Sequence, residues 1–477
     1  MFKLIFFKEL KDILQSSRFT ISFAVCSVLI ILAFFMGAQN YLTSQAQYEA
    51  AVQENRNQIA GNTDWMMVEH SIMLPPQPLM ALVNGVSNDI GRNIRMSSLG
   101  ELRAENTRFN DEPLFAIFRF LDLEFIFGIV LSLFAIIFAY DAINGEKQSG
   151  TLKLCFANPV SRAAFIGGKL LGSVTALSVA LLIPMLIGSL LLPLLGVQLS
   201  GEEWARLGLI MLAGLLYFGV FLALAMGISA IAKRPSNSFL MGLVVWIFAV
   251  LIIPRASVLI SGRMVDVPNI DEITSQKNKY RMQLFDEDRP KMANFDATAD
   301  PDLSEEEQMQ DMMSRFSAFM GELSATRQEK MDIFGNRLNE DFTNKRRQQE
   351  KLALSLSRIS PTSVFTLAIT ELAGTSVNLQ NRFMDAAYTY QSSYANFMTE
   401  KTGSTRGGGF RMIVITDGDD AEEPEPLDPN EMPQFQFTTQ TAGIVAGNSM
   451  IDLSLLMLFN IMFFGGAFAA FLKFDLR

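Results

Sequence analysis

Side chains that commonly carry out catalysis are scarce in this sequence. Among its 477 residues there is one histidine, His70, and there are two cysteines, Cys26 and Cys155. Any nucleophilic system that uses an imidazole would depend on His70, and a metal site with several histidines cannot form. Cys26 lies in an apolar segment and Cys155 in a polar one, so we expect two unpaired structural thiols. The sequence shows no catalytic constellation, which disfavours a membrane-anchored enzyme.

Methionine is abundant, with 26 residues, and two groups of it could bind a soft metal ion. Clustered thioethers bind Cu(I), so copper handling is one interpretation of these groups. Methionine also fills gaps in apolar cores, and the second group repeats at helical spacing, so we favour packing. The groups are Met66, Met67, Met73 and Met80, which flank His70, and Met309, Met312, Met313 and Met320.

Two further patterns could bind charged ligands, but each departs from the motif it resembles. The acidic run Asp417–Glu431 lacks the spacing and the closing glutamate of a calcium loop, so we interpret it as a solvated loop. Gly167-Gly168-Lys169 lacks the first glycine and the final Ser or Thr of a phosphate-binding loop. The net charge of −10 argues against nucleic acid as the main partner, because phosphate binding needs clustered Lys and Arg.

The apolar residues are concentrated in six segments. Hydrophobic residues make up 49% of the sequence and charged residues 18%, whereas soluble proteins carry about 25% charged residues. A helix needs about 20 apolar residues to cross a bilayer. The segments are residues 19–38, 121–140, 166–195, 207–232, 238–260 and 447–472. They predict an all-α polytopic membrane protein with six transmembrane helices, the first of which lacks a signal-peptide cleavage site.

Lysine and arginine residues near the ends of these spans predict their orientation. They gather before the first span, between the second and third, between the fourth and fifth, and after the sixth. All these segments fall on one side if the spans alternate, and positive loops stay in the cytoplasm. We therefore place both termini in the cytoplasm and residues 39–120 and 261–446 outside it. Ionisable residues are nearly absent from the spans, which disfavours a proton- or ion-coupled transporter.

The two extracytoplasmic regions are predicted to be largely helical. Residues 45–60 have the composition of a polar helix. In the second region, Ser304 and Glu307 form a capping box that begins a long helix. Apolar residues then repeat in steps of three or four from Met309 to Phe342, which predicts a paired helix within a hairpin or stalk.

The cytoplasmic segment 141–165 contains a short helix held between two spans. Gly150 interrupts the chain, and Thr151 can cap a helix over residues 152–156. Asn158-Pro159 ends that helix, because the residue before a proline avoids the helical conformation. A short helix fixed between two spans makes a rigid lever, and a partner that pushes on it would move both spans.

This segment resembles a loop of the exporter-type permeases of the ABC type-2 family. The shared pattern is E-x-x-x-G-T-L, then P-V-S-R, then G-K at the start of the next span. The resemblance implies that residues 141–165 form the coupling segment, which docks on the ATPase subunit in that family. The residues at the matching positions are Glu146, Gly150, Thr151, Leu152, Pro159, Arg162 and Lys169.

Two other stretches are similar to the same family. Residues 1–18 resemble its interfacial elbow helix, with a broad apolar face that Lys3 and Glu9 interrupt. Ser360-Pro361 and residues 371–383 resemble a branch that carries two large extracytoplasmic insertions. That branch includes the permeases of gliding-motility and nitrous-oxide-reductase-maturation systems.

The resemblance also implies partners, a location and a function. ATP and Mg²⁺ would bind to a separate ATPase subunit, with no cofactor on this chain, and a second permease copy or a paralogue would complete the membrane part. The implied location is the bacterial cytoplasmic (inner) membrane. Two functions remain open: ATP-driven export of a substrate, or mechanotransmission, in which ATPase motion is relayed to an extracytoplasmic partner protein and no cargo moves.

Overall fold

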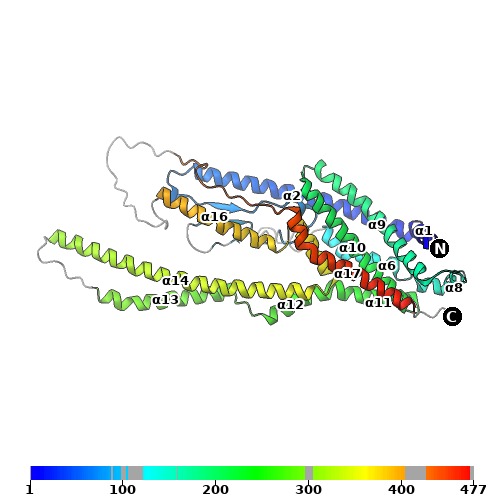
Figure 1. Cartoon of the computed structure of the whole chain (residues 1–477). Coiled ribbons are helices and arrows are strands. Elements are labelled where there is room, and N and C mark those ends of the chain that lie inside the picture. The colour runs from blue at the N-terminus through cyan, green and yellow to red at the C-terminus, as the bar shows by residue number, and fades with distance from the viewer. Residues whose placement is uncertain are drawn as a thin grey trace. The chain divides into compact units, whose positions relative to one another are not determined.

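The computed structural model describes residues 2–87, 90–97, 102, 104–105, 122–157, 159–295, 305–402 and 426–472. The chain divides into two compact units (Figure 1). Unit 1 comprises Met1–Pro254 and Arg358–Arg477, and unit 2 comprises Arg255–Ser357.

Helices dominate the described part of unit 1. They are α1 (Phe2–Leu14), α2 (Ser17–Ala60), α5 (Leu123–Phe125), α6 (Ser132–Ala139), α7 (Asn144–Gln148), α8 (Thr151–Phe156), α9 (Arg162–Leu194), α10 (Gly201–Ile231), α11 (Pro235–Trp246), α15 (Pro361–Ala373), α16 (Asn378–Thr402) and α17 (Ala442–Leu472). Shorter elements are the 3-10 turns η1 (Trp65–Met67) and η2 (Pro78–Ala81) and the π-helical segments η3 (Ile126–Leu131) and η4 (Ile247–Ile252). The helix α12 (Ile253–Met264) runs across the boundary between the units.

Six helical segments among the described residues are long and apolar enough to cross a membrane, which confirms the six-span prediction. Several are longer than the apolar segments that predicted them, because helix continues past the apolar part. The first, α2, extends through the predicted polar helix as one helix of 44 residues. The six segments are Ser17–Ala60, Leu123–Gln148, Arg162–Leu194, Gly201–Ile231, Pro235–Met264 and Ala442–Leu472.

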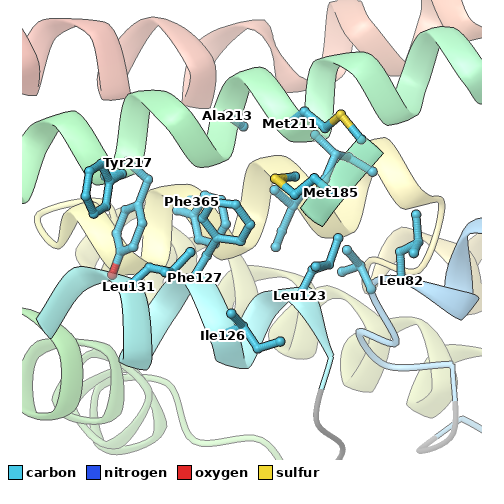
Figure 2. Close-up of a cluster of buried hydrophobic side chains, with 14 of the residues drawn as sticks. Leu82, Leu123, Ile126, Phe127, Leu131, Met185, Met211, Ala213, Tyr217 and Phe365 are labelled. Carbon is cyan, nitrogen blue, oxygen red and sulfur yellow. The ribbon is translucent and has the colours of Figure 1, made fainter. Parts of the chain in front are cut away.

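The central helix of unit 1 is α10. Its most apolar stretch is 72% buried, against 17% for α17, and it packs against α6, α15 and α17. The core beside it is aromatic: the rings of Tyr217 and Phe365 stack with centroids 4.5 Å apart, and Phe127 lies 5.8 Å from Phe365 (Figure 2). Close packing of this kind holds helices together in a bilayer, where the surrounding lipid is as apolar as the side chains.

A loop segment inserts into this helical core. Residues 79–83 are almost fully buried and belong to the same apolar cluster as the spans. The segment packs against α2 at Gly37, where an added Cβ atom would lie 1.6 Å from the carbonyl oxygen of Ala81. Glycine at this helical position therefore permits a backbone-to-backbone contact that no other residue allows.

Replacing Gly37 with alanine should destabilise the protein by about 1–3 kcal/mol or more, because the added methyl group forces the 79–83 segment away from α2. A drop in the thermal unfolding midpoint of the purified chain in detergent would report this loss. Gly208→Ala is a matched control in α10, where an added Cβ atom meets nothing within 4 Å. An unchanged midpoint in Gly37→Ala would contradict the close contact.

The part of unit 1 beyond the apolar end of α2 has its own core. Three short antiparallel strands, in the order β1 (Ser71–Met73), β2 (Asn93–Arg95) and β3 (Ala104–Glu105), form a small sheet. The helix α16 contributes Phe383, Tyr390 and Tyr394 to the apolar cluster that also contains Ile94 of β2. The sequence analysis predicted a largely helical region and did not identify these strands, because strands of two or three residues are too short to show an alternating pattern.

The helix α15 lies within the residue range that was predicted to be extracytoplasmic, yet ten of its 13 side chains are buried. It packs against α10 and α17, two of the six candidate spans. A helix of 13 residues is too short to be recognised as a span from hydropathy, because crossing the bilayer takes about 20 apolar residues.

Unit 2 contains a hairpin of α13 (Ile270–Ala293) and α14 (Glu305–Ser357), as predicted. The rings of Tyr280 and Phe334 stack at 4.2 Å across it, and Arg327 forms a 3.2 Å ion pair with Asp288. Met309 and Met313 were predicted to lie in the packing seam, but their side chains are 63% and 70% exposed.

The predicted capping box of Ser304 and Glu307 lies outside the residues whose side chains the structure describes. The same holds for most of the acidic run Asp417–Glu431, of which residues 426–431 are described.

Candidate functional site

The segment between the second and third spans forms two short helices, α7 and α8, separated by a left-handed turn. Gly150 takes the N-cap position of α8 with a φ of +78°, a conformation that favours glycine. The sequence analysis assigned the cap to Thr151, but this residue is the first of the helix. Its hydroxyl instead donates a 3.2 Å hydrogen bond to the backbone carbonyl of Glu146, which ties α8 to α7.

A buried ionic cluster joins this segment to two other helices. The Nζ atom of Lys169 lies 2.9 Å from Oε1 of Glu146 and 2.9 Å from Oε2 of Glu9. Lys169 is on α9, Glu146 on α7 and Glu9 on α1, and the lysine is only 4% exposed. Lys8 approaches Glu146 at 3.9 Å from the solvent side. Because one cation satisfies two carboxylates, the cluster fixes the positions of three elements at once.

Glycines on α9 allow α1 to come close enough for this cluster to form. A Cβ atom at Gly168 would lie 3.0 Å from Cγ2 of Ile5, and one at Gly172 would lie 2.9 Å from Cβ of Glu9. The Gly-Gly-Lys sequence that resembled a phosphate loop therefore forms a helix–helix contact surface. Sequence reasoning treated Glu9 as a defect in the apolar face of α1, whereas the structure makes it a partner of Lys169.

An apolar cluster also fixes α8 to neighbouring helices. Leu152 is 2% exposed and packs with Phe165 of α9 and Phe471 of α17, whose rings stack at 5.4 Å. Arg162, at the start of α9, donates a hydrogen bond to the backbone carbonyl of Leu472. The short helix is therefore fixed to the ends of two spans.

A third attachment connects the segment to the central helix. The hydroxyl oxygen of Ser229 on α10 accepts hydrogen bonds from the backbone N–H groups of Ile143 and Asn144, at 3.1 and 3.3 Å. Ser229 and Asn144 are fully buried. Buried backbone N–H groups need such partners, so this contact holds the start of α7 in place.

The seven residues that matched the family pattern divide into two sets. Five make the internal contacts described above: Glu146, Thr151, Leu152, Arg162 and Lys169. Thr151 is also exposed to solvent, and of the remaining two residues Pro159 is exposed and Gly150 is half-buried. The sequence analysis did not include Leu154 among the coupling residues, although its side chain is 70% exposed. An alternating Leu-Lys-Leu stretch in a predicted helix could have identified it, since residues two apart lie on nearly opposite sides.

Two of the methionines that flank His70 in the sequence, Met67 and Met80, have different environments. Met80 is buried in the core of the spans, while Met67 is 75% exposed. Both ring nitrogens of His70 are hydrogen-bonded, Nδ1 to Asn55 at 3.1 Å and Nε2 to the Tyr390 hydroxyl at 2.9 Å. The ring therefore has no free nitrogen for a metal ion. Cys26 and Cys155 are both free thiols.

Comparison with known proteins identifies the family that this sequence matches. The sequence model of the family described as "ABC-2 family transporter protein" matches residues 4–476. A protein of Stutzerimonas stutzeri described as "Probable ABC transporter permease protein NosY" is 36% identical over 125 residues, which cover 26% of this chain and 45% of that protein. A Pseudomonas aeruginosa protein of the same description is 37% identical over 130 residues, covering 27% of this chain and 46% of that protein.

The chain spans less than half the length of these two curated relatives. The family match, in contrast, extends over almost the whole chain and includes every candidate membrane span. The chain is therefore a multi-pass membrane protein that belongs to the ABC-2 transporter family, whose relatives are permease subunits of ABC transporters.

Proposed function

We propose that this permease subunit couples ATP hydrolysis on a separate ATPase chain to the export of a substrate. ATP and Mg²⁺ bind to that partner, and a second permease copy or a paralogue completes the transporter in the bacterial inner membrane, with both chain termini in the cytoplasm. In this proposal, α1 is the interfacial elbow helix, and its exposed Leu4 and Phe7 contact lipid.

The proposal rests on the contacts that fix α8 in place and on its one exposed leucine. It contacts α7 through Thr151, the ends of α9 and α17 through Leu152, and presents Leu154 outward. A rigid helix with one exposed leucine suits docking into an apolar pocket of a partner, because little conformational freedom is lost on binding. Force applied to this helix would reach α9 and α17 directly.

Leu154→Ala should weaken the binding of the cognate ATPase about tenfold or more, because a central apolar contact of an interface often contributes about 2 kcal/mol. The affinity is measured with the full-length permease in lipid nanodiscs. Ile333→Ala is a matched control, since Ile333 is an exposed apolar residue on α14 with 65% exposure, against 70% for Leu154. Equal affinities for Leu154→Ala and the wild type would contradict the docking surface.

A second function, mechanotransmission without cargo, is favoured by the length of unit 2. Its helix α14 has 53 residues, which corresponds to about 80 Å at 1.5 Å per residue. Hydrogen exchange of α13 and α14 during ATP turnover in proteoliposomes tests this function. A turnover-dependent change without any change in the contents of the vesicles would favour mechanotransmission over export.

A further inference from the structure

The central helix α10 makes polar contacts near both ends and at its middle. The residues are Arg206, Tyr217 and Ser229, and all three are at least 95% buried. Arg206 and Ser229 are 23 positions apart, which corresponds to about 35 Å along a helix, roughly the thickness of a bilayer. Buried polar side chains in a membrane bundle are costly and therefore mark sites with a specific task.

The contact at Ser229 holds the start of the coupling segment, as described above. Its hydroxyl oxygen accepts two backbone hydrogen bonds from Ile143 and Asn144. Among the described residues, Ser229 is the acceptor for both of these N–H groups, so a displacement of the start of α7 acts on α10.

The contact at Tyr217 joins α10 to a π-helix and to α15. The tyrosine hydroxyl lies 2.9 Å from the backbone carbonyl oxygen of Gly128 in η3, to which it donates. It also lies 2.9 Å from Oγ1 of Thr362, in the first turn of α15, and Figure 2 shows the hydroxyl directed to the ribbon of η3. A π-helix is a single widened turn within an α-helix and is often found at functional sites.

The second π-helix, η4, is joined to the same group of hydrogen bonds. Ser132 donates a 2.7 Å hydrogen bond to the Gly128 carbonyl and accepts one of 2.8 Å from Nε1 of Trp246, the residue before η4. Ser360, the N-cap of α15, donates to the carbonyl oxygen of Ala249 within η4. In each π-helix, a backbone carbonyl oxygen therefore accepts a hydrogen bond from a buried side chain: Gly128 in η3 and Ala249 in η4.

The contact at Arg206 joins α10 to the other end of α15. Its Nε atom donates a 2.6 Å hydrogen bond to the backbone carbonyl of Leu372. Gly374, the left-handed C-cap of α15, leaves room for the guanidinium group, because a Cβ atom there would lie 2.8 Å from Nη2 of Arg206. Thus α10 contacts the first turn of α15 through Tyr217 and the last turn through Arg206.

The helix α15 occupies a junction in the chain. Unit 2 ends at Ser357, three residues before the N-cap of α15, and α16 of the outer part of unit 1 begins at Asn378. A displacement of α15 would therefore move the chain segments that connect it to unit 2 and to α16.

We propose that α10 and α15 form the transmission element between the coupling segment and the two outer regions, and that Tyr217 is its positioning residue. Movement of α7 pulls on Ser229, α10 moves as one rigid helix, and Tyr217 with Arg206 carries α15 along. The role of this linkage in the transporter rests on the proposed docking of an ATPase on α8. The linkage itself is a property of this chain and can be tested without an ATPase.

The test measures hydrogen exchange of α15 in the full-length chain in nanodiscs. Ser229→Ala removes the acceptor at the coupling segment, and we expect it to raise exchange of residues 361–373 at least threefold. In a Tyr217→Phe background, which lacks the hydroxyl, Ser229→Ala should add no further change. Equal effects of Ser229→Ala in both backgrounds, or no effect on α15 at all, would overturn the proposal.

Two further variants keep the result interpretable. Thr362→Val breaks the contact between Tyr217 and α15 while preserving shape, so it serves if Tyr217→Phe does not fold. Tyr390→Phe also removes a buried tyrosine hydroxyl with two partners, His70 and Pro433, but in the outer part of unit 1. The effect of Ser229→Ala on α15 should persist in that background. Failure of ATPase binding would contradict the proposed function and leave this result unaffected.

Discussion

Lys169→Met is expected to destabilise the protein by about 3–5 kcal/mol, the usual cost of breaking a buried ion pair by removing one partner. Without the ammonium group, Glu9 and Glu146 would face each other in a site where their side chains are 13% and 16% exposed. Lys8 stays on the solvent side, 3.9 Å from Glu146, and cannot replace a cation that bridges both carboxylates. The thermal unfolding midpoint in detergent, together with the yield of folded protein, measures the effect.

A triple variant separates the ion cluster from other roles of this lysine. Combining Lys169→Met with Glu9→Gln and Glu146→Gln removes all three charges, and we expect it to recover most of the lost stability, because an uncharged replacement of a buried ion cluster is often neutral. If Lys169 acted only as a contact to the ATPase, Lys169→Met would leave the unfolding midpoint unchanged and weaken ATPase binding alone.

The second large effect is a pH dependence that arises from His70. Burial lowers the pKa of His70 to about 4, whereas an unfolded chain titrates near 6.5. Asn55 cannot turn to accept a proton from His70, because its amide is fixed by two hydrogen bonds to the backbone of Ser71. Tyr390 donates its hydroxyl hydrogen to the carbonyl of Pro433, so it accepts the hydrogen of Nε2. The network therefore requires a neutral imidazole.

The sign of the effect follows from the lowered pKa. Above pH 6.5 the histidine is neutral in both states and contributes no pH dependence, whereas between pH 6.5 and about 4 only the unfolded chain binds the proton. Stability should fall as the pH decreases through this window, by up to about 3 kcal/mol in total. His70→Gln should abolish this contribution, so the comparison of pH profiles between wild type and variant isolates it.

A single histidine makes the direct measurement simple. Because the chain contains only His70, selective isotope labelling of histidine gives one imidazole resonance, whose chemical shift can be followed from pH 7.5 to pH 3.5. We expect a midpoint near the lowered value. A midpoint near 6.5 would mean that the ring is solvated and that the hydrogen-bond network with Asn55 and Tyr390 does not form.

Features of the fold that depend on composition over many residues could be predicted from the sequence. The six spans are apolar over about 20 residues each, and the structure contains six such helices among the described residues. The hairpin of α13 and α14 was likewise predicted from a repeat that extends over some 30 residues. Long patterns of this kind persist whatever the tertiary environment.

Features that depend on contacts between distant residues could not be predicted. Glu9 and Lys169 are 160 positions apart, and neither position alone shows that the two side chains share a buried site. The helix α15 was missed because its 13 residues are too few for a span. The sequence analysis included Leu152 and not Leu154 among the coupling residues, whereas Leu152 is buried and Leu154 is exposed in the structure.

The shortness of α15 also constrains how the protein is made. At about 1.5 Å per residue, its 13 residues give a helix that the insertion machinery has no reason to recognise as a membrane span. During synthesis α10 is complete before α15 emerges, but α17, the other helix against which it packs, begins only at Ala442. The packing surface that buries α15 is therefore complete only after α17 has been synthesised. Biogenesis must keep this apolar helix from misfolding or aggregating until then, and a chain truncated before Ala442 would never bury it.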